Sequence, residues 1–111
     1  MDDQAARVTP VVVVLPQEID VTNSEQVYEQ LVAALVPGVA TVIADMTSTV
    51  FCDSSGVHAI MHAYESCDAR DVRMRLAVSP ATSVRRVLEL IGVGRLMPVH
   101  ASLQEALTAS D

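Results

Sequence analysis

The chain is poor in glycine and in aromatic residues, and it contains no tryptophan. Of its 111 residues, only four are glycine, two are tyrosine and one is phenylalanine. So few glycines leave no glycine-rich phosphate loop, which argues against the common kinds of nucleotide site. Because half of the residues are nonetheless hydrophobic, we expect an aliphatic core. This length fits one domain built around a single core.

Positive charge and long apolar runs are also scarce. Seven basic residues, all of them arginine, stand against fourteen acidic ones, so the formal net charge is −7. No stretch approaches the roughly 18 apolar residues of a membrane-spanning helix. We therefore expect neither membrane insertion nor direct binding to nucleic acid, whose phosphates would repel so acidic a chain.

Cysteine is too sparse to suggest a metal site or a disulfide framework. Cys52 and Cys67 lack the spacing of metal ligands, and no further ligands accompany them. We expect two reduced core thiols and no cofactor. The acidic start, residues 1–4, differs from the basic start of a secretory signal. These features predict a cytoplasmic protein.

Hydrophobic patterning predicts strands that alternate with helices. The expected strands are residues 10–15, 39–44, 73–78 and 97–99, with a loop at 45–52 that contains a possible short extended piece. The unbroken β-branched run at 10–15 favours a strand covered on both faces. The alternation at 73–78 favours a strand with one less buried face. This β-α-β-α order predicts an α/β fold with a parallel sheet.

Helix starts are indicated by capping residues. Thr22–Glu25 and Ser102–Glu105 both have the pattern of a capping box. Ser79 followed by Pro80 predicts a third start, with serine as N-cap and proline in the first helical position. A fourth helix is expected from Ser54, because apolar residues recur at helical spacing after it. The domain is expected to span residues 10–108, after a flexible or reduced edge strand at 1–9 and before a short tail at 109–111.

Asp53-Ser54-Ser55-Gly56 is the most informative segment. It lies where the helix from Ser54 begins, and the free N–H groups and positive dipole end of a helix start favour an anion. Two interpretations are open. The segment is a plain N-cap, or one serine accepts a phosphate that the helix start tolerates. Serine catalysis fits poorly, because the glycine two residues before the serine of a nucleophile elbow is missing.

Other polar groups follow this segment or precede it. His58 and His62 are four residues apart on the same helix, but the glutamate of the zinc-protease motif is absent, and we expect a partly solvated pair. Asp20, Asp45 and Asp53 are expected near strand ends, where parallel sheets usually bind ligands. They form either a solvated acidic rim or a catalytic or metal-binding group.

Four segments, in this order, resemble the STAS family and specifically its bacterial anti-sigma-factor antagonists. These segments are Glu18–Asp20, Asp45–Val57, Ser79–Val93 and Ser102–Leu107. The resemblance extends from about residue 10 to residue 107. It implies a single STAS-like α/β domain, with a mostly parallel central sheet of about four to five strands and about four helices.

The resemblance also implies a function. In that family the serine directly after the motif aspartate, here Ser54, is phosphorylated by an anti-sigma factor that is also a serine kinase. The unphosphorylated protein binds that anti-sigma factor and frees a sigma factor, phosphorylation blocks the binding, and a serine phosphatase restores it. Such a protein is a binding module and not an enzyme. The implied partner-binding residues are Asp20, Asp53, Ser54, Ser55, Gly56 and His58.

The sequence departs from the family pattern in its short N-terminal segment, where we expect the family's first strand to be reduced or missing, and at two single positions. Gln17 replaces the glycine of the first turn, and His58 replaces a common small residue after the serine motif. Two other functions are alternatives to this regulation by phosphorylation. One is a non-switching STAS subunit of a transporter or other multiprotein complex. The other is a small metal-dependent enzyme that uses the three aspartates Asp20, Asp45 and Asp53.

Overall fold

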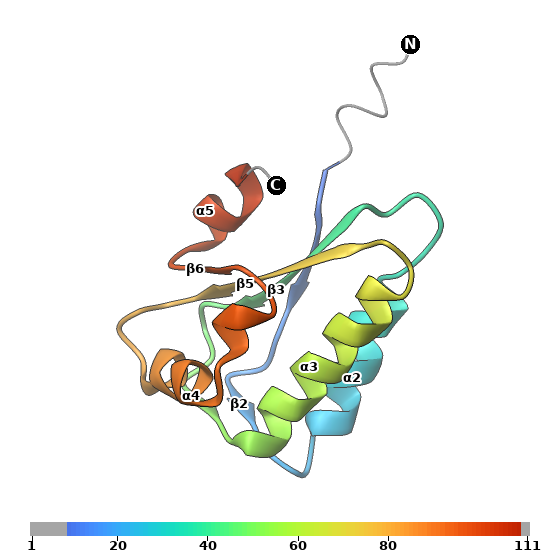
Figure 1. Cartoon of the computed structure of the whole chain (residues 1–111). Helices are drawn as coiled ribbons and strands as arrows, with labels where there is room; N and C mark the ends of the chain where they lie inside the picture. Colours follow the sequence, from blue (N-terminus) through green and yellow to red (C-terminus); the bar gives the residue numbers. More distant parts are fainter. Residues whose placement is uncertain (1–8, 110–111) are drawn as a thin grey trace.

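The computed structural model describes residues 9–109, and Figure 1 shows the arrangement of its elements. The expectations for residues 1–8 and 110–111 lie outside this range. In chain order the elements are β1 (Val11–Val14), β2 (Glu18–Ile19), α2 (Ser24–Ala33), β3 (Thr41–Met46), β4 (Phe51–Cys52), α3 (Ser54–Asp68), β5 (Arg73–Val78), α4 (Ser83–Ile91), the 3-10 turn η1 (Val93–Arg95), β6 (Val99–His100) and α5 (Leu103–Thr108).

The main sheet has the spatial order β1-β3-β5-β6, and every neighbouring pair is parallel. The two longest strands, β3 and β5, lie at its centre. Each step from one strand to the next passes through a helix, as parallel pairing requires. The expected α/β fold with a mostly parallel central sheet is therefore confirmed.

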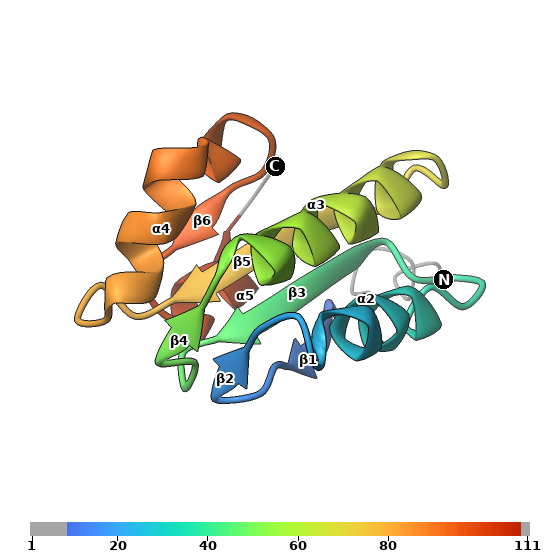
Figure 2. The same cartoon turned by 90° about the horizontal axis from the view of Figure 1, so that it is seen from below.

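One face of the sheet carries the larger core. It is covered by α2 and α3, which lie side by side, and by α4 (Figures 1 and 2). The alternating residues of β5 illustrate the packing, since Met74, Leu76 and Val78 all point into this core. Aliphatic and sulfur-containing side chains fill it, as composition predicts. Cys52 and Cys67 are both free and buried there, which confirms the expected core thiols.

The opposite face is covered by α5, which makes a second, smaller core from Ile43, Ala77 and Ala106. Arg75 also lies on this face, only 4% exposed, and its Nη1 donates to the Ala106 carbonyl oxygen at 2.9 Å. The expectation that β5 has a less buried face is therefore wrong. Its alternating arginines resemble a solvated face in sequence, but the terminal helix folds back over the second of them.

Strand β1 is less buried than the sequence predicts. It lies at the edge of the sheet, and Val14 is 60% exposed. Full coverage of both faces is therefore wrong for the C-terminal end of this strand. A run of valines satisfies β propensity whether one or both faces are covered, so the sequence does not distinguish the two cases.

Two of the three predicted capping signals are wrong. Thr22 donates its hydroxyl to the Asp20 carboxylate, and the N-cap of α2 is Asn23, without a capping side-chain bond. Helix α4 begins at Ser83 and not at Pro80, because Ser79 to Thr82 forms a turn closed by a bond from the Thr82 N–H to the Ser79 carbonyl.

The N-cap of α5 is confirmed, since the Ser102 hydroxyl accepts from the Glu105 N–H at 3.1 Å. The second bond of the predicted capping box differs, because the Glu105 carboxylate accepts from the Ala101 N–H at 3.3 Å and not from the N–H of Ser102. At the end of α4, Gly92 adopts the left-handed conformation, with φ of 89°, that a helix C-terminus favours.

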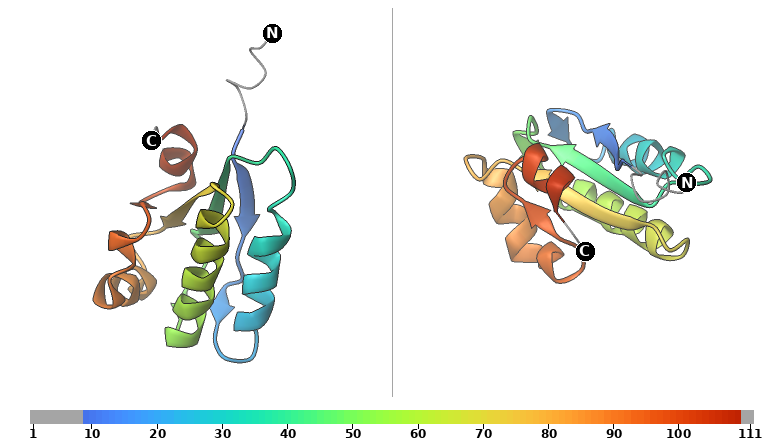
Figure 3. Two further views of the ribbon diagram at one scale, coloured as in Figure 1. Left: turned by 45° about the vertical axis from the view of Figure 1, so that its right-hand side comes forward. Right: turned by 90° about the horizontal axis from the view of Figure 1, so that it is seen from above.

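A second, small sheet of two strands lies next to the start of α3. Strands β2 and β4 pair in parallel, with Glu18 opposite Phe51 and Ile19 opposite Cys52. This pairing joins the turn before α2 to the segment before α3, so the two helices begin at the same end of the molecule (Figure 3). The short extended piece expected within residues 45–52 is β4. Within the described range, no helix is long and apolar enough to cross a membrane.

Candidate functional site at the start of helix α3

Asp53 is the N-cap of α3. Its backbone is extended, and its Oδ1 accepts from the Ser55 N–H at 2.9 Å and from the Gly56 N–H at 3.2 Å. Its carbonyl oxygen accepts the next bond, from the Val57 N–H at 3.1 Å. The first-turn donors that an anion would otherwise seek are thus largely satisfied by Asp53 itself. Asp53 is therefore the N-cap of α3, and neither serine is needed for that role. The choice of a phosphate acceptor then depends on the surroundings of the two serine hydroxyls.

The two serines have different surroundings. The Ser55 hydroxyl donates to Asp53 Oδ1 at 2.6 Å, and its side chain is half-buried. Ser54 is the first residue of the helix and is exposed, and among residues 9–109 its hydroxyl makes no hydrogen bond. Of the two serine hydroxyls, that of Ser54 is therefore the more accessible.

Gly56 allows the helix to approach the small sheet closely. A Cβ at this position would lie 2.6 Å from Cys52 Sγ and 2.6 Å from Ile19 Cγ2, closer than carbon and sulfur side-chain atoms can pack. The Asp53 N–H donates to the Ile19 carbonyl oxygen at 3.1 Å. This bond also holds the start of α3 against the small sheet, at what we call the junction of α3 with β2 and β4. The position of Ser54 is thus set by packing against β2 and β4.

Asp20 lies across this junction, in the turn that opens α2. Its Oδ1 accepts from the Thr22 N–H at 2.9 Å, and its backbone oxygen accepts from the N–H groups of Asn23 and Ser24. Asn23 closes the turn by donating its side-chain amide to the Glu18 carbonyl at 2.8 Å. Asp20 is therefore an ordered, half-buried carboxylate at the same end of the molecule as Asp53.

The expected acidic rim does not form a metal site in the part of the chain that the structure describes. No group of three potential ligand side chains occurs there. Asp45 is buried, and its Oδ1 accepts from the N–H of Thr47 at 3.0 Å and from its hydroxyl at 2.7 Å. Since Asp20, Asp45 and Asp53 each order a separate turn, the proximity that motivated a metal-dependent enzyme is missing.

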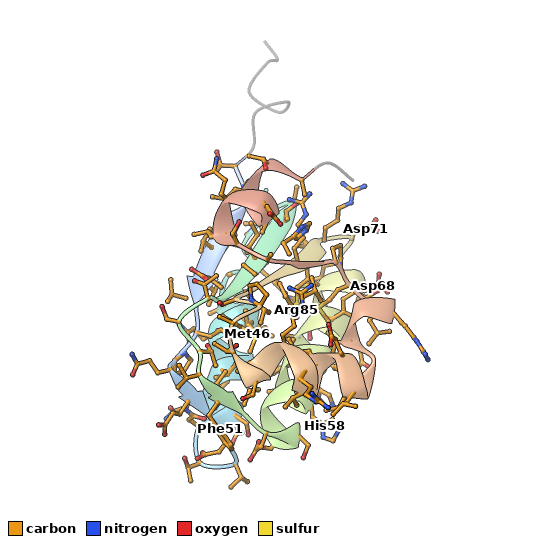
Figure 4. All side chains as sticks on the ribbon, turned by 90° about the vertical axis from the view of Figure 1, so that its left-hand side faces the viewer. Met46, Phe51, His58, Asp68, Asp71 and Arg85 are labelled. Atoms are coloured by element: carbon orange, nitrogen blue, oxygen red, sulfur yellow. The ribbon has the colours of Figure 1, made fainter. Side chains whose placement is uncertain are left out.

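His58 is exposed on the first turns of α3, near the end of the molecule where Phe51 also lies (Figure 4). It borders a shallow groove between α2 and α3. The residues that line the groove are Ser24, Glu25, Tyr28, Ser55, His58, Ala59 and His62. Tyr28 and His62 meet edge to face, with ring centroids 6.2 Å apart. The two histidines are solvated, as their spacing suggests.

Exposed apolar side chains around the site were not predicted from the sequence. Val21 is 76% exposed beside the Asp20 turn, and Val50 and Phe51 are 56% and 48% exposed in the segment before Asp53. Large apolar side chains gathered near one point mark an interaction surface. Alternation within β4 could have revealed Phe51, because Cys52 faces the core and its neighbour must face outward.

The electrostatics of the site follow from these bonds. The hydrogen bond from the Ser55 hydroxyl, with the backbone N–H groups of Gly56 and Ser55, holds the pKa of Asp53 below its usual range. Burial, aided by the Asp53 charge, raises the pKa of the Cys52 thiol to about 11. At neutral pH the site thus contains a carboxylate beside a free hydroxyl and a protonated, unreactive thiol.

The sequence profile of the STAS domain family matches residues 3–106. The chain belongs to the STAS domain family. This STAS domain is 31% identical over 96 residues to the anti-sigma-F factor antagonist RsfA of Mycobacterium tuberculosis, covering 84% of this chain and 73% of RsfA. The resemblance seen in the four motifs is thereby confirmed.

Three solved structures are also similar to this chain. The unphosphorylated anti-sigma factor antagonist SpoIIAA is 31% identical, with a TM-score of 0.68 over 89% of this chain and 87% of the other. The phosphorylated form of the Bacillus SpoIIAA is 30% identical, with a TM-score of 0.63 over 89% of this chain and 88% of the other. An antagonist from Mycobacterium paratuberculosis, at 22% identity and a TM-score of 0.76, covers 87% of this STAS domain and 81% of its own chain and shares the fold.

Proposed function

We propose that this STAS domain is an anti-sigma-factor antagonist that acts by partner switching. In its unphosphorylated form it binds an anti-sigma factor that is also a serine kinase, and a sigma factor is released. Phosphorylation of Ser54 blocks the binding, and a serine phosphatase reverses it. These exchanges take place in the cytoplasm, and the domain itself is not a catalyst.

The observation that carries this proposal is the exposed hydroxyl of Ser54 at the first residue of α3, which has no hydrogen-bond partner within residues 9–109. A kinase needs an accessible hydroxyl that can enter its active site. The Ser55 hydroxyl is held by Asp53 and is the poorer acceptor. The relatives RsfA and SpoIIAA, both named as anti-sigma factor antagonists, support the same function.

The partner surface that we propose surrounds Ser54. The carboxylates of Asp20 and Asp53, the Ser55 hydroxyl, His58 and the exposed apolar side chains Val21, Val50 and Phe51 form its contacts. Gly56 contributes indirectly by letting α3 begin close to the small sheet. A mixture of exposed apolar area with a few charges is typical of a regulated protein interface.

The switch acts through electrostatics. A phosphate on Ser54 adds roughly 1.5 to 2 negative charges next to the Asp53 carboxylate. Because Asp53 already occupies the first-turn N–H groups, the phosphate remains directed outward and must be desolvated when a partner docks. Unbalanced charge in an interface costs roughly 2–5 kcal/mol, which corresponds to a loss of affinity of about 30-fold or more.

Phosphorylation and binding can be tested with one set of variants. The anti-sigma factor kinases encoded in the same genome would be incubated with the domain, ATP and Mg²⁺, and the product analysed by mass spectrometry. We expect one phosphate, on Ser54, which Ser54→Ala abolishes and Ser55→Ala retains. Calorimetry should show at least about 30-fold weaker binding for Ser54→Asp.

Two outcomes would contradict the proposal. One is phosphate on a residue other than Ser54, and the other is equal affinity of the wild type and Ser54→Asp. Recovery of transporter subunits and no kinase in a pull-down from cells would instead favour the non-switching STAS subunit.

A further inference from the structure

The guanidinium of Arg85 on α4 is poorly partnered. Its side chain is 29% exposed, yet Nη1 is enclosed and has no hydrogen-bond partner among residues 9–109. Its ionic contact within that range, from Nε to Glu89 Oε2, is 3.7 Å long, which is too long for a hydrogen bond. Arginine four residues before glutamate is also the weaker order for such a pair on a helix. A charged donor is thus left unsatisfied, which costs free energy.

Arg85 borders an open surface cavity that a second arginine, Arg86, also lines. The cavity, of about 480 Å³, lies between the turn before α4, α4 itself and the chain after β6, and it is lined by Pro80, Thr82, Arg85, Arg86, Glu89 and Ala101. In Figure 4, Arg85 projects from α4 toward the chain around β6. Glu89 is the acidic side chain of this lining. The cavity therefore combines two positive charges with one negative charge, on a chain whose net charge is −7.

The start of α4 carries positive charge, whereas the start of a helix favours negative charge. The first turn of α4 contains no acidic residue. Thr82 makes no capping bond to the N–H groups of this turn, and its hydroxyl donates to the Ser79 carbonyl at 3.2 Å. Arg85 and Arg86 are the third and fourth residues of α4 and lie in this first turn, where the positive end of the helix dipole disfavours cations. An anion in the cavity would compensate both the dipole and the two guanidinium groups.

We propose that this cavity binds a phosphate-sized oxyanion between Arg85 and Arg86. The planar fork of arginine matches the oxygens of phosphate in a bidentate arrangement. Two arginines that line one cavity can together balance a dianion, whereas a carboxylate carries a single charge. Among residues 9–109 the ionic contact of the Arg85 headgroup is the 3.7 Å one to Glu89, so the enclosed Nη1 has no hydrogen bond to break when rotation of the terminal torsions brings it to the ligand. The site is on α4, so it is independent of the function proposed for α3.

Titration with inorganic phosphate tests the site. Amide chemical shifts of the intact chain would be followed at constant ionic strength, with chloride as the replaced anion, because screening alone moves the shifts of charged regions. We expect saturable shifts centred on residues 82–86 and 101. Acetate should bind more weakly, because it offers a single charge and two oxygens.

Matched variants decide which charges are responsible. Removing a charge-assisted hydrogen bond in Arg85→Gln should raise the phosphate Kd by about tenfold or more. Arg70→Gln makes the same change in net charge at an exposed residue outside the cavity and should leave Kd unchanged. Glu89→Gln removes the opposing carboxylate and should lower Kd. Thermal unfolding of each variant establishes that it is folded.

The proposal is overturned if the wild type gives only small, non-saturating shifts. It is also overturned if Arg85→Gln and Arg70→Gln weaken phosphate binding equally, because the attraction is then a diffuse effect of net charge. Tighter binding in Arg85→Gln would be equally decisive against it.

Discussion

The hydroxyl of Ser55 donates a 2.6 Å hydrogen bond to the carboxylate of Asp53, and this contact separates the roles of two adjacent serines. Ser55 becomes part of the cap, whereas Ser54 is left exposed as the first residue of α3. Capping and switching therefore belong to different residues. A modification of Ser54 can change the surface while the bonds that begin the helix remain in place.

The cap makes a definite contribution to stability. Asp53→Ala removes the acceptor of the Ser55 and Gly56 N–H groups and should lower the free energy of unfolding by about 1 kcal/mol, the usual cost of losing an N-cap. Ser54→Ala, at the neighbouring residue, removes a hydroxyl without a bond in the described range and should change it by less than about 0.5 kcal/mol. Urea unfolding monitored by circular dichroism would measure both, and equal losses would contradict the division of roles.

The pH dependence of stability follows from the same bonds. Because the pKa of Asp53 is lower in the folded chain than in the unfolded chain, the unfolded state binds more protons at acidic pH. The contribution of Asp53 is complete above its unfolded pKa of about 4 and is lost as the pH falls through the folded pKa.

Replacing the carboxyl group tests this sign. Asp53→Asn should therefore lose less stability than the wild type between about pH 4 and pH 2. Urea unfolding at several pH values would give the difference. Parallel pH profiles of the two proteins would show that the folded pKa of Asp53 is not lowered.

The buried thiols should be inert in the folded protein. Burial together with the Asp53 charge raises the pKa of Cys52 to about 11, and burial also raises the pKa of Cys67. The nucleophile in alkylation is the thiolate, which is scarce at pH 8 when the pKa is this high. Iodoacetamide at pH 8 should modify neither residue until urea unfolds the chain, as mass spectrometry would record. Rapid labelling of Cys52 in the folded state would mean that β4 detaches readily.

The sequence predicts the parallel sheet and the start of helix α3 well because both depend on local chemistry. The β-branched runs and helical stripes set the order of elements, and Asp53 before two serines marks a helix start. The failures arise where tertiary contacts override a local signal. Thr22 has the pattern of a cap, but Asp20 takes its hydroxyl and orders a different turn.

The burial of β5 is a second case in which a tertiary contact overrides a local sequence pattern. Arg75 alternates with apolar residues as if it faced water, but α5 returns over it and accepts its hydrogen bond. The contact joins residues 31 positions apart, which no local pattern can reveal. The exposed position of Ser54 relative to Ser55 likewise depends on a side-chain bond that the residue types permit but do not require.

Gly56 gives the sharpest test of how the site is positioned. Gly56→Ala places a methyl group 2.6 Å from both Cys52 Sγ and Ile19 Cγ2, and neither atom can move freely in its buried setting. The start of α3 must shift away from the small sheet, at a cost of about 1–3 kcal/mol in the free energy of unfolding. Gly94→Ala is the matched control, because nothing lies within 4 Å of its added Cβ. It should change the stability by less than about 0.5 kcal/mol.

A second substitution separates steric conflict from other effects of the added methyl group. Cys52→Ala removes one of the two obstructing atoms, so in the Gly56→Ala background it should cost less than it does alone, which a double-mutant cycle by urea unfolding would measure. Additive losses would mean that the methyl group does not meet Cys52. If the junction does position Ser54, Gly56→Ala should also slow its phosphorylation while the protein remains folded, whereas Gly94→Ala should leave the rate unchanged.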